Sequence, residues 1–194
     1  MAETDEELVG KAQEGNRKAF ERLVERYQRM VVNTAYRILR NREDAEDAAQ
    51  ESFVRAYTFL STLREGTKFT SWLYRIVTNI CFSKVKTSHA QQVFVDVDGE
   101  EAEAKYPELR DSTVNPEEVV ANEEFSGQIR ELVASLPPQY RAVLTLYHLN
   151  DFSYNEIAET LGLPIGTVKT HLYRAKEMLK KAILQRYRME ELCL

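Results

Sequence analysis

The residues best suited to chemistry in this sequence are basic and polar side chains near its C-terminus. Residues 164–188 hold seven Lys and Arg residues against one acid, Glu177. Such a local excess of positive charge suits the phosphates of a nucleic acid. At about 100° per residue, a helix starting at Ile165 presents polar groups on one side and its flanks, where they could bond to base edges. These candidate DNA-binding residues are Thr167, Lys169, Thr170, His171, Tyr173 and Arg174.

A short helix and the helix that follows it are expected to position this polar side. Ser153 and Glu156 have the spacing of a capping box at the start of the first helix, and Gly162 is suited to end it. The second helix has four apolar residues that should pack inward, namely Val168, Leu172, Ala175 and Leu179. A helix, a short glycine-containing turn and a second helix with polar groups outward is the helix-turn-helix arrangement. The alternative is an ordinary bundle whose basic helix face is simply solvated.

The first half of the chain contains an acidic helix face and a segment rich in aromatic residues. Asn41 is suited to cap a helix whose first turns are acidic, where the helix dipole favours negative charge. Asp44, Asp47 and Glu51 recur on one side of that helix. A further helix is predicted over about residues 70–86, and its aromatic rings could stack on unpaired bases. Both segments are candidates for binding a macromolecule.

The sequence argues against catalytic or metal-dependent chemistry. His89, His148 and His171 lack a spacing that would make them metal ligands with each other or with a carboxylate. Cys81 and Cys193 lie far apart and outside any CxxC pattern, so neither a disulfide framework nor a zinc ribbon is indicated. Cys81 is expected to be a free thiol in the core. We therefore expect no enzyme activity, cofactor, metal or small-molecule substrate.

The net charge of −5 hides an uneven distribution. Residues 96–124 contain eleven acids and two bases, and the chain on either side carries a small positive excess. No apolar run approaches the roughly 20 residues needed to cross a bilayer. The acidic N-terminus lacks the pattern of a signal peptide. We expect a cytoplasmic protein without membrane insertion.

Helical periodicity in both halves predicts an all-α protein with two small domains. The periodicity fades between about residues 88 and 122, where acids accumulate and Pro107 and Pro116 interrupt any helix. The stretch 93–95 is too isolated to predict a sheet. The predicted organisation is a first domain over residues 1–90, an acidic flexible linker over 91–124 and a helix-turn-helix domain over 125–194.

Three segments together resemble the extracytoplasmic-function (ECF) subfamily of bacterial RNA polymerase sigma factors. They are EDAEDAAQESF (residues 43–53), FTSWLYRIVTN (69–79) and LPPQYRAVLTLYHLNDFSYNEIAETLGLPIGTVKTHLYRAKEML (136–179). Their order and spacing, together with the acidic linker, carry the resemblance, which covers nearly the whole chain. It implies a sigma region 2 in the first domain and a sigma region 4 in the second.

The resemblance implies a role for each segment. The first is similar to the part of region 2 that docks on core polymerase, which implies an interface of Asp44, Asp47, Gln50 and Glu51. The second resembles the element that melts and binds the minus-ten promoter region. Its implied contacts are Phe69, Trp72, Tyr74, Arg75, Asn79, Lys84 and Lys86. The third resembles region 4, which reads the minus-thirty-five element, with Lys169, Thr170, Tyr173 and Arg174 at contacting positions.

Two details qualify the minus-ten segment. Trp72 shares a helical side with Leu73 and Ile76, so it is equally a candidate for the core. After Asn79 the chain reads CFSKVK, where the family usually carries an Asp and then arginines. The lysines of this stretch keep the positive charge.

The predicted function is a sigma factor that associates reversibly with core RNA polymerase, recognises two promoter elements and opens the DNA. The resemblance also implies an anti-sigma partner that holds the protein inactive. One alternative is a conventional helix-turn-helix regulator, although a receiver domain should show alternating strands and helices in the first half. Another is a sigma-like decoy for an anti-sigma factor, against which the basic recognition helix argues.

Overall fold

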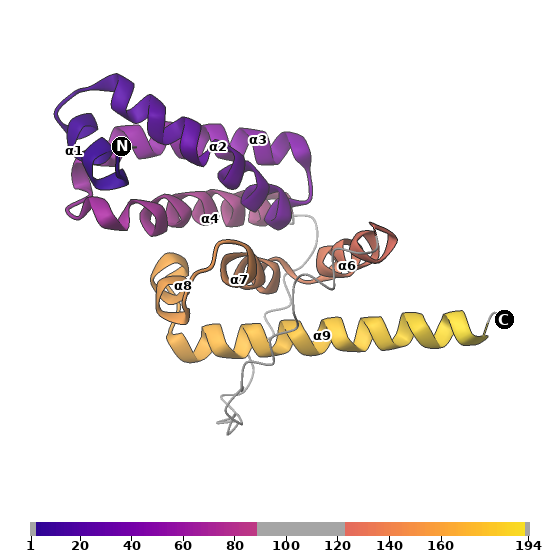
Figure 1. Ribbon diagram of the computed structural model, residues 1–194. Helices are drawn as coiled ribbons and strands as arrows, with labels where there is room; N and C mark the ends of the chain where they lie inside the picture. The colour runs from indigo at the N-terminus through magenta and orange to yellow at the C-terminus, as the bar shows by residue number, and fades with distance from the viewer. Residues whose placement is uncertain (1–2, 89–122, 193–194) are drawn as a thin grey trace.

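The computed structural model describes residues 3–88 and 123–192, and every regular element within these ranges is a helix (Figure 1). This confirms the predicted all-α fold. None of the helices in this part of the chain is long and apolar enough to span a membrane. The predicted linker lies outside the described residues except for its last two, which open helix α6. His89, Cys193 and the stretch 93–95 also lie outside them.

The first unit contains residues 3–88, in which short turns and 3-10 helices join the α-helices. The first three α-helices each begin at a side chain that accepts a hydrogen bond from a backbone N–H of the first turn. These caps are Thr4, Asn16 and Asn41, so the predicted cap at Asn41 is confirmed. The elements are α1 (Asp5–Gln13), α2 (Arg17–Leu39), α3 (Arg42–Phe59), η1 (Leu60–Thr62), η2 (Gly66–Lys68) and α4 (Phe69–Ser88).

Small residues on the inner face of α3 allow the helices of this unit to pack closely. Five of them are at most 3% exposed: Ala45, Ala48, Ala49, Ser52 and Ala56. The Ser52 hydroxyl satisfies its hydrogen-bonding capacity locally by donating to the Ala48 carbonyl at 2.5 Å. Cys81 lies in the same core, as predicted, and burial raises the pKa of its thiol to about 12.

The second unit consists of α6 (Glu123–Ser135), α7 (Pro138–Leu149), α8 (Tyr154–Leu161) and α9 (Ile165–Leu192). The capping box that opens α8 is confirmed, because Ser153 Oγ accepts from the Glu156 N–H at 3.3 Å and the Ser153 N–H donates to Glu156 Oε2 at 2.8 Å. Gly162 ends α8 in the left-handed region, with φ of 65°. The inner face of α9 is buried at Val168, Leu172 and Ala175. This confirms the predicted helix-turn-helix.

The two units pack directly against each other, with α7 against α2 and α8 against α4 (Figure 1). Tyr74 of α4 is fully buried in the core of the second unit. Ala142 of α7 is fully buried in the core of the first. Each unit therefore contributes a residue to the core of the other, an arrangement that no sequence pattern predicted.

Candidate nucleic-acid and protein interfaces

The start of α9 presents the polar face that the sequence predicted. Lys169 and Arg174 are exposed, and the Tyr173 ring is 41% exposed. Thr167 is half-buried, and so is Thr170, whose hydroxyl donates to the Gly166 carbonyl at 2.9 Å. The face is therefore formed mainly by long side chains, while the threonines lie closer to the backbone.

His171 differs from the other candidates on α9 because its ring is held inside the unit. The ring is half-buried and meets Tyr140 edge to face, with 5.2 Å between the ring centroids. An imidazole in this position supports the packing of α7 against α9. It is less available to DNA than Lys169 or Arg174.

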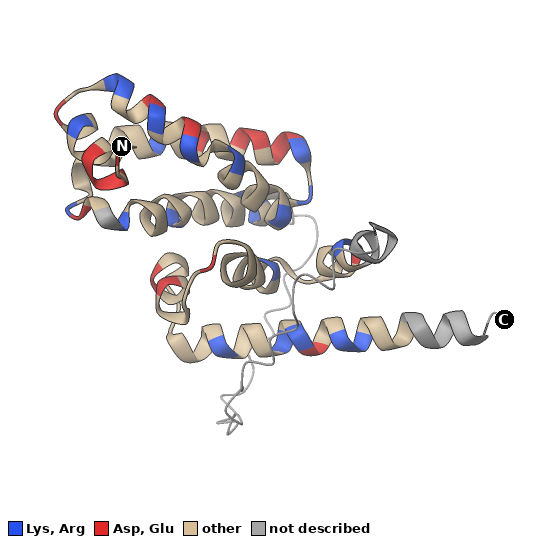
Figure 2. Cartoon of the chain, in the orientation of Figure 1, with Lys and Arg blue, Asp and Glu red and all other residues tan. Residues whose placement is uncertain are grey.

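Two lysines that the sequence analysis did not single out extend the basic face of α9. At about 100° per residue, Lys176 and Lys180 lie on the same side as Lys169 and Tyr173. Both lysines are exposed, and Lys176 Nζ lies 5.7 Å from the centroid of the Tyr147 ring. Lys and Arg recur along the helix with a single acid among them in its described side chains (Figure 2). The sequence signal that could have identified Lys176 was its seven-residue spacing from Lys169, which places both lysines on one side of the helix.

On α4, four of the predicted minus-ten residues share one side of the helix. Trp72, Arg75, Asn79 and Lys86 fall within about 60° of one another at about 100° per residue. Trp72 is half-buried, and the other three are exposed. The structure therefore brings an aromatic ring, an amide and two cations onto one accessible face.

The remaining three predicted minus-ten residues do not lie on that face. Phe69 is fully buried, with its ring centroid 5.5 Å from that of Tyr27 and 6.0 Å from that of Trp72. Tyr74 is fully buried beneath the second unit. Lys84 points toward α3, where its ammonium lies 3.8 Å from both Asp44 and Asp47. In this conformation none of the three is placed to stack on a base or to lie along a single strand.

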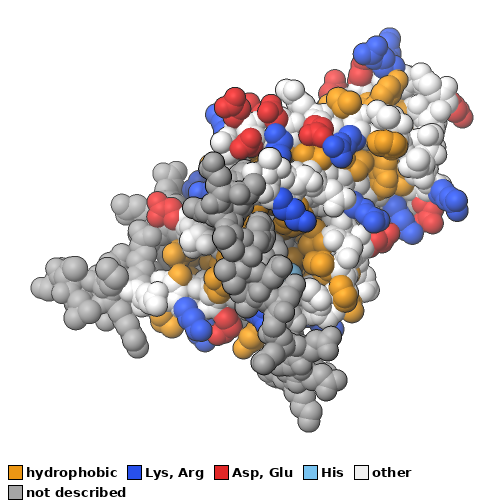
Figure 3. Space-filling model, turned by 180° about the vertical axis from the view of Figure 1, so that it is seen from behind, with side chains coloured by type: hydrophobic (Ala, Val, Ile, Leu, Met, Phe, Trp, Pro, Cys, Tyr) orange, Lys and Arg blue, Asp and Glu red, His pale blue; other side chains and the backbone are white. Residues whose placement is uncertain are grey.

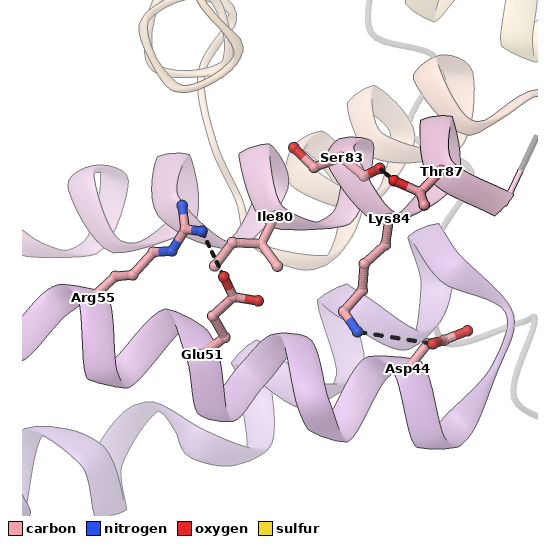
Figure 4. Close-up of a pocket in the computed structure, with 7 residues that line it drawn as sticks. All are labelled: Asp44, Glu51, Arg55, Ile80, Ser83, Lys84 and Thr87. Carbon is pink, nitrogen blue, oxygen red and sulfur yellow. Dashed lines mark hydrogen bonds and ion pairs between the residues drawn. The ribbon is translucent and has the colours of Figure 1, made fainter. Parts of the chain in front are cut away.

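A shallow pocket separates α3 from α4, and predicted polymerase-binding residues line one of its walls (Figure 4). Asp44 faces Lys84 across this pocket, and Glu51 pairs with Arg55 at 2.6 Å. Both acids are half-buried, whereas Asp47 and Gln50 are exposed on the outer face. The four predicted residues thus divide into two that line the pocket and two that face outward.

The outer face of α3 also carries an apolar residue that the sequence analysis missed. The Val54 side chain is 66% exposed and lies on the same side as Asp47 and Gln50. Seen from behind, Asp and Glu side chains gather over the end of the first unit at which α3 begins (Figure 3). Single exposed apolar residues are common on protein surfaces, so Val54 by itself does not mark an interface. Val54 could have been identified from the sequence because it is an apolar residue that lies off the side of the helix on which the buried apolar residues recur.

Comparison with known proteins identifies the family. The Sigma-70 region 2 family matches residues 23–90, and the Sigma-70 region 4 family matches residues 126–179. The ECF RNA polymerase sigma factor SigW of Bacillus subtilis is 34% identical over 176 residues, which are 90% of this chain and 94% of that protein. The chain is an ECF RNA polymerase sigma factor. The ECF RNA polymerase sigma-E factor of Escherichia coli (strain K12) is 35% identical over 93% of this sigma factor and 94% of its own length.

Solved structures share the fold of this sigma factor. The structure of CnrH in complex with the cytosolic domain of CnrY matches with a TM-score of 0.64 and 23% identity, covering 94% of this chain and 97% of that one. The sigma factor RpoE in complex with the anti-sigma factor NepR from Bartonella quintana matches with a TM-score of 0.61 and 20% identity, covering 86% and 97%. As a sigma factor, the protein directs RNA polymerase to promoters in transcription initiation, which confirms the predicted function.

Proposed function

We propose that residues 1–90 of this sigma factor bind core polymerase and the minus-ten element, and that residues 125–194 read the minus-thirty-five element. Residues 91–124 join the two. The observation that carries this assignment is the presence of three accessible helix faces of different chemistry, on α3, α4 and α9. One is acidic with an apolar residue, one combines an aromatic ring with cations, and one is basic.

The outer face of α3 is the proposed polymerase contact. Asp47 and Gln50 supply polar groups for a basic partner surface, and Val54 supplies an apolar anchor that loses water on binding. Asp44 and Glu51 contribute from the pocket wall, after exchanging their present partners Lys84 and Arg55.

The exposed side of α4 is the proposed contact for the minus-ten strand. Arg75 and Lys86 can hold phosphates, Asn79 can bond to a base edge, and the half-buried Trp72 ring can stack on an unpaired base. Phe69 acts from the core, where its contact with Trp72 positions that ring. Its role in DNA binding is therefore one of positioning.

The start of α9 is the proposed minus-thirty-five reader. Arg174 offers a planar fork for guanine, and Lys169 and Tyr173 can reach a base or a phosphate. Thr167, Thr170 and His171 are half-buried and would add contacts to the same element closer to the helix backbone. Lys176 and Lys180 continue the positive charge toward neighbouring phosphates.

The protein would act in the cytoplasm by binding alone, without covalent chemistry or a cofactor. Among the described residues no group of three His, Cys, Asp or Glu side chains could hold a metal ion. An anti-sigma factor would hold the chain inactive, as the solved complexes of related fold with CnrY and NepR suggest.

Reconstitution tests the assignment directly. The purified chain is mixed with bacterial core RNA polymerase and fragmented genomic DNA, and the run-off transcripts are sequenced. We expect discrete start sites that share two upstream elements. Arg75→Ala should reduce initiation at these sites, whereas Arg29→Ala, at an exposed position of α2, should not. DNA binding without polymerase-dependent starts would point instead to a conventional regulator.

A further inference from the structure

The interface between the two units contains a part-buried chain of hydrogen bonds. Asn150, at the end of α7, donates from Nδ2 to the Tyr74 hydroxyl at 2.7 Å. Asn150 Oδ1 accepts from the Thr34 hydroxyl of α2 at 3.4 Å. The Tyr74 ring meets Phe152 edge to face, with 5.3 Å between the centroids. One asparagine of the second unit thus binds two helices of the first.

Arg141 of α7 makes a second polar contact across the interface. The Arg141 side chain is 9% exposed and donates from Nη2 to the Ile38 carbonyl at 2.7 Å. Through Nη1 it donates to the Ala134 and Leu136 carbonyls at 2.7 and 2.8 Å. The Ile38 carbonyl belongs to the last turn of α2, where the helix dipole favours a cation. Arg141 therefore ties α2 to the turn between α6 and α7.

The packed arrangement is too short to serve both promoter elements at once. The two elements are centred about 25 base pairs apart, which is about 85 Å of straight duplex at about 3.4 Å per step. In the packed form, α4 lies directly against α8 and α8 against α9, so the two proposed DNA-binding helices are only about two helix diameters apart, which is roughly 20 Å. A chain bound to both elements must therefore have separated its two units.

We propose that this sigma factor inhibits itself by closing region 4 onto region 2, and that Thr34, Tyr74, Arg141 and Asn150 form the polar latch that holds it closed. The inference rests on the proposed function, because it assumes that α4 and α9 serve the two elements. Closure buries the Tyr74 ring, and opening exposes it on the side of α4 away from Trp72. The outer face of α3 is accessible in the closed form, so closure blocks simultaneous binding of the two promoter elements and not the proposed polymerase contact. A promoter that carries both elements then selects the open form.

Closure reduces the apparent affinity of the holoenzyme for a promoter with both elements, because only the open fraction of the chain can bind both at once. Loss of one interface hydrogen bond should raise the ratio of open to closed chain about fivefold to tenfold. While the open form is the minor species, affinity for such a promoter should rise by the same factor. The latch therefore predicts a gain of binding from a mutation outside every proposed contact face.

The first experiment measures the distance between the units in the free protein. Fluorescent labels are attached at Glu25→Cys on α2 and Asn155→Cys on α8, both exposed positions, in a Cys193→Ser background. Cys81 is fully buried, which keeps it from the label. The variant is Asn150→Ala, and Thr34→Val is a second variant that removes the 3.4 Å bond to Asn150 and the hydrogen bond of Thr34 to Tyr74 but keeps the bond from Asn150 to Tyr74. The matched control is Asn33→Ala, which removes the same amide from an exposed position beside Thr34.

We expect energy transfer to show mostly closed chain in the wild type and in Asn33→Ala. Asn150→Ala should increase the open fraction, and Thr34→Val should increase it by less. Circular dichroism checks that the variants keep their helix content. A wild type that is already open, or an unchanged distance in a folded Asn150→Ala variant, would refute the latch.

The second experiment titrates a promoter that carries both elements with the holoenzyme formed by each labelled chain. Asn150→Ala should bind more tightly than the wild type by the factor measured for opening, and Asn33→Ala should bind as the wild type does. Opening without tighter binding would refute self-inhibition while leaving the closed state intact. Failure of the wild type to direct promoter-specific starts would instead overturn the proposed function, since the distance measurement does not depend on it.

Discussion

The two fully buried aromatic residues of α4 are buried for different reasons. Phe69 packs against Tyr27 and Trp72 inside the first unit, so separation of the units leaves it covered. Tyr74 is covered by Phe152 and Asn150 of the second unit. Only Tyr74 can therefore change its exposure without unfolding of region 2.

Arg174→Ala should weaken binding to the cognate minus-thirty-five element by about 1 to 3 kcal/mol and relax the preference at one base pair. The reason is loss of the paired hydrogen bonds that an exposed guanidinium can form with guanine. Holoenzyme binding to a library of single-base promoter variants measures both effects. Equal loss on every sequence would make Arg174 a phosphate contact.

Asp47→Lys should reduce affinity for core polymerase with little change in thermal stability, because Asp47 is exposed and its contact with Lys84 is a 3.8 Å surface pair. The new lysine opposes a basic partner surface. Glu25→Lys makes the same charge change on an exposed part of α2 and should bind normally. A large drop in melting temperature would indicate a structural role for Asp47.

The sequence predicts which helix faces are charged, but it does not predict which of those charges pair with a neighbouring helix. Asp47 and Arg174 lie outward as periodicity requires. The pairing of Lys84 with α3 depends on packing between residues 40 positions apart. Val54 carried only a weak signal, because a single exposed apolar residue is common on protein surfaces.

At the scale of helices, local chemistry determined most of the boundaries. Asn41 and Ser153 cap the starts of α3 and α8, and Gly162 ends α8, as the preferences of these residue types predict. The end of α2 is different, because Arg40 adopts φ of 62°, a conformation that glycine or asparagine usually occupies. No pattern in the sequence indicates an arginine there.

Ser153→Ala should lower the stability of region 4 by about 1 kcal/mol at neutral pH, because it removes the cap of α8. Hydrogen bonds from the Ser153 side chain and backbone lower the pKa of Glu156. The part of the capping contribution that comes from the Glu156 carboxylate is therefore present above the ordinary carboxyl pKa and is lost as pH falls through the lowered value, whereas the bond from the Glu156 N–H to Ser153 Oγ remains. Thermal unfolding at pH 7 and pH 3 should show a difference between wild type and variant that shrinks in acid. Ser61→Ala, at an exposed serine of η1, should leave stability unchanged at both pH values.

Tyr27 should make region 2 sensitive to alkali. Its hydroxyl donates to Asp5 and is bonded to Thr70 at 2.8 Å, which joins α1, α2 and α4. Burial, and then the bond to Asp5, raises the pKa of Tyr27 to about 12. Because this value lies above that of an unfolded tyrosine, stability is full below about pH 10 and falls as pH rises toward 12. Unfolding measured from pH 8 to pH 12 should show this loss, and Tyr27→Phe should weaken it.

At the scale of the whole molecule, the two units form one packed body. Tyr74 and Asn150 are 76 positions apart, and each is polar, so hydrophobic periodicity places neither in an interface. Sequence reasoning predicted each unit but not their contact. The contact depends on two surfaces that become complementary only after both units have folded.

Arg141→Met should destabilise the protein by about 3 kcal/mol, because it leaves two buried carbonyl groups and one part-buried carbonyl group without their charged donor. Arg141→Lys should recover part of this loss, since an ammonium keeps the charge but lacks the planar fork. Arg29→Met, at an exposed position, serves as the control. Urea unfolding measures all three, and an unchanged midpoint for Arg141→Met would contradict the bridging role.

The alanine-rich inner face of α3 restricts how this protein can change over evolutionary time. A larger residue at any of the positions from Ala45 to Ala56 that are buried against the core would overpack it, at a cost of about 1 to 3 kcal/mol. Substitution is then confined to the outer half of the helix, where Asp47, Gln50 and Val54 lie. Substitutions that tune the proposed polymerase contact are therefore expected on one side of α3, whereas substitutions to larger residues on the other side would destabilise region 2.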